Sequence, residues 1–127
     1  MKKVYSPENL FKELAKYYFF NKEIKFNYRP NWLKNSKTGR NLELDVYIPE
    51  IKLAFEIQGF HHNWIEQFDK DQIKREKCWE NEIKLVEVWR LGKIIHIINK
   101  WILPNSNKKD IPDFIKKEIR KVQLKYR

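Results

Sequence analysis

The sequence predicts an α/β fold, because segments whose apolar residues recur at helical spacing are interspersed with segments in which apolar and polar residues alternate. In order, the predicted elements are a helix, three strands, a helix, a strand and two helices. The 127 residues suit one compact domain, 1–127, with a core of about 7–90 and C-terminal helices at about 92–127.

The first helix is expected over about residues 7–20, after a Ser-Pro pair that supplies an N-cap and a first helical residue. Its predicted buried stripe consists of apolar residues at helical spacing, namely Leu10, Leu14 and Tyr17. Glu13 falls inside this stripe, whereas Glu8 falls on the far side of the helix. Glu13 is therefore the acid of this helix to consider further, with an ordinary pair to a lysine as the alternative.

Three strands are expected after this helix. The first covers 24–28, and a polar loop rich in turn residues covers 29–41. The segments 42–48 and 51–58 alternate on either side of a turn at Pro49, so they are expected to form a hairpin.

The hairpin is expected to bring two acids together. In its first arm Asp45 lies on the face opposite the apolar residues, and in its second arm Glu56 and Gln58 lie opposite Phe55. Counting back from the turn places Asp45 roughly level with Glu56 on the adjacent strand.

The second half of the chain continues with a helix at about 64–81, a strand at 84–89 and a helix at 92–103 that Pro104 stops. A last helix opens between Asp110 and Pro112. Its apolar stripe is expected to contain Ile111, Phe114, Ile115, Ile119 and Val122.

The formal net charge of +10 indicates a polyanionic partner, either a nucleic acid or an anionic membrane surface. No apolar run approaches the ~18 residues that span a bilayer, and the N-terminus does not resemble a signal peptide. The single Cys78 excludes an internal disulfide and a cysteine-rich zinc site, so a reducing, cytoplasmic setting is expected. Abundant Lys, Asn and Ile with little Ala suggest an AT-rich genome, such as that of a virus or phage.

Asp45 and Glu56 carry the functional prediction. Hydrolysis of a phosphodiester needs a cation that polarises the phosphate and a water activated for in-line attack. Mg²⁺ suits two carboxylates, because it binds few protein oxygens and keeps several waters, and Mn²⁺ is expected to substitute. The backbone carbonyl of Ile57 is a candidate third ligand.

The segment ELDVYIPEIKLAFEIQ, residues 43–58, resembles the metal-binding hairpin of the PD-(D/E)XK nucleases. In that superfamily one acid precedes the turn and a second acid opens the (D/E)XK triplet. The predicted order α-β-β-β-α-β is similar to the superfamily's common core. The resemblance therefore implies a restriction-endonuclease-like fold with a mixed central sheet and C-terminal helices.

The continuation is similar to a narrower group. EIQGFHH followed by DKDQIKREKCWENEIKLVEVW resembles a phage and viral branch related to the very-short-patch repair and EDxHD homing endonucleases. Members tend to carry an acid-x-x-Gly-x-x-His run and then Asp-x-x-Lys on the next helix. This resemblance makes His62 the motif histidine, Asp71 and Lys74 the helix pair, and Glu13 the acid of the first helix.

The triplet Glu56-Ile57-Gln58 departs from the family pattern at its third position. A glutamine stands where the family usually has a lysine that orients the attacking water and stabilises charge. Gln58 can orient a water but carries no charge. Either His62 or Lys74 is therefore expected to supply the missing function, or activity is expected to be reduced.

Basic residues in the loop before the hairpin are candidate phosphate contacts, and these are Arg29, Lys34, Lys37 and Arg40. Trp32 in the same loop is expected either to pack beneath it or to stack on a base.

The predicted function is a Mg²⁺-dependent endodeoxyribonuclease that acts on DNA, with a homodimer where both strands are cut. One alternative is a structure-specific nuclease such as a junction resolvase, and another is a catalytically silent DNA-binding module of the same fold. An HNH nuclease is suggested by the pair His61 and His62 but does not fit the hairpin acids. Simpler interpretations are that the two histidines belong to an ordinary loop and that Asp71 and Lys74 form a surface ion pair.

Overall fold

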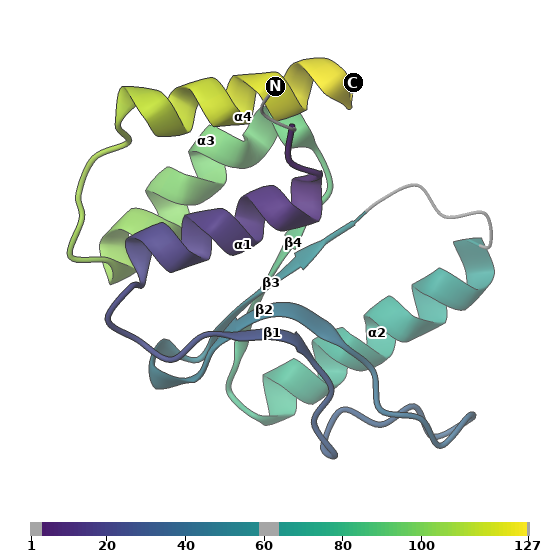
Figure 1. Ribbon diagram of the computed structural model, residues 1–127. Coiled ribbons are helices and arrows are strands. Elements are labelled where there is room, and N and C mark those ends of the chain that lie inside the picture. Colours follow the sequence, from purple (N-terminus) through teal and green to yellow (C-terminus); the bar gives the residue numbers. More distant parts are fainter. Residues whose placement is uncertain (1–3, 59–63, 127) are drawn as a thin grey trace.

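The computed structural model describes residues 4–58 and 64–126, with side chains in the second range described from residue 67 onward. A four-stranded sheet forms its centre (Figure 1), in the order β1 (Lys25–Tyr28), β2 (Leu44–Ile48), β3 (Leu53–Ile57) and β4 (Lys84–Val88). The pairs β1–β2 and β2–β3 are antiparallel, whereas the pair β3–β4 is parallel. The predicted α/β class, with a mixed sheet and C-terminal helices, is therefore confirmed.

Helices cover both faces of the sheet (Figure 1). On one face lie α1 (Pro7–Tyr18), α3 (Ile94–Ile97) and α4 (Asp113–Lys125), and on the other lies α2 (Trp64–Glu80). The helix α1 contacts β2, β3 and α4, while α2 contacts β4. Within the described ranges, no helix combines the length and the apolar character needed to cross a membrane.

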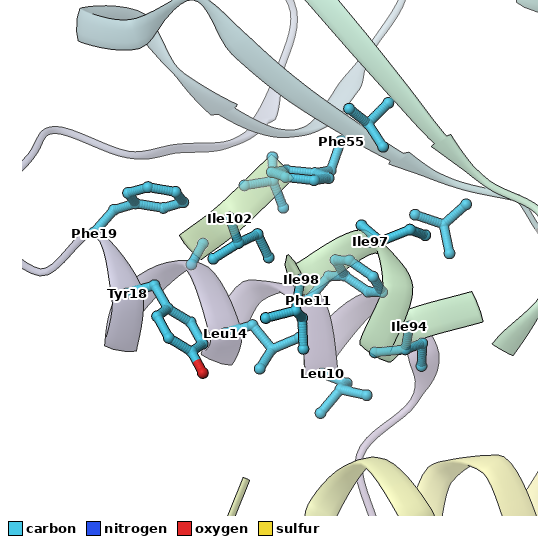
Figure 2. Packing of buried hydrophobic residues seen from close by; sticks show 14 of the residues in the cluster. Leu10, Phe11, Leu14, Tyr18, Phe19, Phe55, Ile94, Ile97, Ile98 and Ile102 are labelled. Carbon is cyan, nitrogen blue, oxygen red and sulfur yellow. The ribbon is translucent and has the colours of Figure 1, made fainter. Parts of the chain in front are cut away.

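Apolar side chains form the core beneath α1 and α3. Figure 2 shows side chains from α1 and α3 packed against Phe55 of β3, and the Phe11 and Phe55 ring centroids are 5.8 Å apart. The Asn9 backbone N–H donates to Ser6 Oγ at 3.2 Å, which is the predicted N-cap. The helix ends at Tyr18, two residues earlier than predicted.

The face beneath α2 holds a smaller apolar cluster, made of Leu33, Leu42, Leu44, Ala54, Cys78 and Ile83. Trp32 packs against this cluster, in agreement with the packing alternative for its role. Cys78 is buried, and burial raises the pKa of its thiol to about 11, so the thiol stays protonated.

Two C-terminal expectations need correction. Residues 91–105 form successive 3₁₀, α, π and 3₁₀ turns instead of one α-helix. Ile94, Ile98 and Ile102, spaced four residues apart, are all buried in the core. In α4, Phe114 is exposed rather than part of the buried stripe, and it contacts the Tyr17 ring edge-on.

Candidate active site

The strands β2 and β3 hold Asp45 and Glu56 beside each other. Val46 pairs with Phe55, and the next step of the same register places Asp45 opposite Glu56. Alternation directs both carboxylates to the face away from Phe55. The backbone N–H of Ile57 donates to Asp45 Oδ2 at 2.8 Å, which fixes the Asp45 side chain against β3.

Glu56 is buried and forms an ion pair with Lys74 of α2. Lys74 Nζ donates to Glu56 Oε2, and the side chains of Lys74 and Glu56 are only 11% and 6% exposed. An ammonium group thus lies against the second acid of the triplet, although the triplet itself carries Gln58. This is the position that a lysine from the next helix was expected to supply.

Asp71 lies one helical turn before Lys74 and is also buried. It accepts a hydrogen bond from Gln67 Nε2 at 2.8 Å. Because Asp71 is buried and Lys74 is paired with Glu56, the two do not form an exposed i,i+3 ion pair. The spacing of three residues places Asp71 and Lys74 on the same side of α2.

Gln58, at the end of β3, is hydrogen-bonded to Glu87, which forms an ion pair with Arg75. Its Nε2 donates to Glu87 Oε1 at 3.4 Å, and Arg75 donates to both Glu87 oxygens at 2.9 Å. Glu87 lies in β4 directly beside Glu56 in the parallel register. With Nε2 engaged, the Gln58 carbonyl oxygen is left to accept a hydrogen bond, for example from a water.

Of the two acids of α1, the structure brings Glu8, and not the expected Glu13, close to Asp45. Glu13 pairs with Lys16 at 3.2 Å and lines a groove between α1 and α4. Carboxylate oxygens of Glu8, Glu43 and Asp45, in contrast, all lie within 4.8 Å of one another.

The physical reason lies in the two buried sides of α1. The predicted stripe through Leu10 and Leu14 lines the groove toward α4. Phe11 and Ala15 are also buried, and Glu8 precedes them by helical spacing, so it lies on their side of the helix. The sequence pattern identified one buried side and missed the other.

Asn27 links α1 to the acidic cluster and was not foreseen. It lies opposite Asp45 in the register of β1 and β2, and its φ of 49° is left-handed, a conformation that asparagine tolerates. Its amide donates to Glu43 Oε1 at 2.7 Å and to Glu8 Oε1 at 3.4 Å, while its Oδ1 accepts from Lys12 Nζ at 2.6 Å. An asparagine within a strand pattern is the only sequence signal of this role.

The crowding of acids perturbs their protonation. Burial raises the pKa of Asp45 to about 7, helped by its hydrogen bond to Glu56 and by the Glu56 charge, against the lowering effect of the Ile57 N–H and of Glu8. Burial and the contact with Asp45 also raise the pKa of Glu8. Near neutral pH these carboxylates therefore favour binding of a proton or another cation.

The four basic candidates lie in the chain between β1 and β2, and two of them have ion-pair partners. Arg29 pairs with Glu43 at 2.8 Å, which brings its guanidinium to the acidic cluster. Lys37 pairs with Asp69 of α2 at 3.3 Å. Lys34 and Arg40 are exposed. His61 and His62 lie outside the described residues.

Proteins of iridoviruses are similar to part of this chain. It is 39% identical to uncharacterized protein 033L of Invertebrate iridescent virus 3, over 47% of the chain and 37% of that protein. It is 38% identical to uncharacterized protein 307L of Invertebrate iridescent virus 6, over 47% of the chain and 39% of that protein. The chain spans less than half the length of the curated relatives it matches. No family model matches it, and no solved structure matches it at a significant level.

Proposed function

We propose that this protein is a divalent-metal-dependent endonuclease that hydrolyses phosphodiester bonds in DNA. The observation that carries the proposal is the pair of carboxylates of Asp45 and Glu56, opposite each other on adjacent strands, with Lys74 against Glu56. The resemblance of residues 43–58 to the PD-(D/E)XK hairpin, and the net charge of +10, support the same conclusion.

The donor set fits Mg²⁺ or Mn²⁺, because both cations favour carboxylate and carbonyl oxygens. Asp45 and Glu56 would hold the ion, and Glu8 and Glu43 bring further carboxylates to Asp45. In a strand the N–H and C=O of one residue point toward the same neighbour. Since the Ile57 N–H points at Asp45, its carbonyl is directed to the same side and would be a further ligand.

When bound, the cation polarises the phosphate and lowers the pKa of a coordinated water. Lys74 would then stabilise negative charge that develops on the phosphate, and its ion pair with Glu56 supports this role. Gln58 would orient the attacking water through its carbonyl oxygen. Arg29, Lys34, Lys37 and Arg40 would contact the backbone of the DNA, outside the reacting atoms.

A catalytically silent DNA-binding module is the second candidate. It is favoured by the Lys74–Glu56 ion pair, which neutralises one proposed ligand, and by Gln58 in place of the family's lysine. The iridovirus relatives and the single buried cysteine agree with action in the cytoplasm of an infected cell. A homodimer on DNA is proposed for double-strand cleavage, because one small active site cuts one strand.

The test is cleavage of supercoiled, nicked, linear and branched DNA by the wild-type protein and by Asp45→Asn, with and without Mg²⁺ or Mn²⁺. We expect metal-dependent nicking or linearisation by the wild type and none by the variant. Faster cleavage of branched DNA would identify a junction resolvase. DNA binding without cleavage under any of these conditions would favour the silent module and refute the nuclease.

A further inference from the structure

We propose that Trp89 stacks on an unpaired base beside the proposed active site, so that the substrate is single-stranded or branched DNA instead of a fully paired duplex. This inference rests on the proposed nuclease function and names the substrate class of that same site.

The position of Trp89 follows from the parallel pairing of β3 and β4. Ile57 pairs with Val88, and the Gln58 backbone N–H donates to the Val88 carbonyl at 2.9 Å. The chain stays extended beyond β4, since Arg90 has φ −130° and ψ 126°. Alternation then places Trp89 on the same face as Glu87, at the end of the sheet where Gln58 lies.

Trp89 is 54% exposed, although it follows a buried strand residue directly. A second aromatic residue of the same region, Phe68 of α2, is 63% exposed. Phe68 lies seven residues before Arg75, so both share one side of α2, and Arg75 pairs with Glu87 of β4. Phe68 is therefore on the side of α2 that carries Arg75, and Trp89 is at the end of the strand that carries Glu87, the partner of Arg75.

The charges around Trp89 suit a polyanion. Arg90 and Lys93 are both exposed, and neither has an ion pair within residues 4–58 and 64–126. Trp79 offers an internal contrast, because it is 84% exposed near the C-terminal end of α2 but lines a groove in which the acids Glu80 and Glu82 balance the bases Arg75 and Lys84. Phosphates would meet no excess of positive charge there.

An exposed aromatic ring with exposed cations close by in the chain is a combination that binds single strands, in which the cations follow the backbone and the ring stacks on a base. The faces of paired bases are covered by their neighbours in a duplex. A stacking contact at Trp89 therefore selects bases that are unpaired near the cleaved bond.

The experiment measures binding of an oligothymidylate and of a duplex of equal length without metal, in an Asp45→Asn background that cannot cleave. Trp89→Ala should weaken oligothymidylate binding by about tenfold or more and leave duplex binding within about twofold. Trp89→Phe should retain most of the affinity because it keeps a ring. Trp79→Ala is the matched control and should bind as the parent does.

Equal weakening of both substrates by Trp89→Ala, or no weakening of either, would overturn the stacking role. The nuclease proposal is judged separately, from cleavage by the wild type with Mg²⁺. Trp89-dependent single-strand binding without any cleavage would leave the stacking site standing and refute the nuclease. Cleavage with oligothymidylate binding that does not depend on Trp89 would refute the stacking site alone.

Discussion

Phe55 and Glu56 are adjacent in β3 and almost equally buried, at 1% and 4% exposure, but they face opposite sides of the sheet. Phe55 lies among apolar side chains of α1 and α3. Glu56 lies against Asp45 and Lys74. Burial of the phenyl ring stabilises the fold, whereas burial of the charges has a desolvation cost that the ion pair only offsets. A face that keeps charges at such a cost is the face expected to carry function.

The side of the sheet covered by α2 is itself divided. Ala54 and Cys78 belong to an apolar cluster at one end, which anchors the helix. Glu56, Asp71 and Lys74 lie toward the other end, where β3 and β4 finish. The apolar end packs α2 against the sheet, and the charged end of the same buried side carries the residues of the proposed chemistry.

The first way to test this contrast is Phe55→Ala. Loss of the ring from the apolar face should cost about 3–5 kcal/mol of unfolding free energy, because a cavity remains. Urea denaturation measures the loss, and cleavage per folded molecule should stay at the wild-type level. A loss of cleavage in fully folded protein would mean that the two faces are not independent.

The second test compares Lys74→Met with the double variant Lys74→Met/Glu56→Gln. The single change leaves a buried carboxylate without its partner and should cost about 3 kcal/mol, as expected for breaking a buried pair. The double change removes both charges and should recover most of that stability while cleavage stays lost. If the losses of unfolding free energy from the two single changes simply added in the double variant, the Lys74–Glu56 ion pair would have no coupling energy.

The third test compares two acids of α1. Glu8→Gln should slow cleavage by about tenfold or more, since Glu8 belongs to the acidic cluster at Asp45. Glu13→Gln is the matched control, because Glu13 pairs with Lys16 on the side toward α4, and it should cleave as the wild type does. The reverse pattern in a cleavage assay would restore Glu13 as the acid of the site.

The fourth test concerns pH. The pKa of Asp45 is about 7 in the fold, against an ordinary value of 3.8. The folded state binds this proton more tightly than the unfolded state does. The stability that the bound proton contributes is therefore fully present below about pH 3.8 and is lost as the pH rises through 7. Relative to Asp45→Asn, the wild type should therefore lose stability over that interval in thermal melts without metal. Parallel curves for the two proteins would contradict the raised pKa.

The hairpin and its two acids could be predicted from the sequence because a short turn and strict alternation fix the register locally. Lys74 could be singled out only through the resemblance of Asp71-x-x-Lys74 to the viral and phage nuclease branch, and its role stays a prediction. The place of Glu8 could not be predicted, because α1 buries one side against the sheet and another against α4. Helical spacing does not tell which of these two sides faces the sheet. Asn27 and Glu87 depend on pairing between strands far apart in the chain, and no local pattern marks their partners.

Calorimetric titration with Mg²⁺ or Mn²⁺ tests, without relying on activity, whether the carboxylates around Asp45 form a divalent-cation site. Near pH 7 the wild type should bind the ion and release a proton, because Asp45 has a pKa of about 7 and must be ionised to act as a ligand. The observed heat should then change with the ionisation enthalpy of the buffer. Asp45→Asn should show neither binding nor proton release. Equal binding by both proteins, or none by the wild type, would contradict the account.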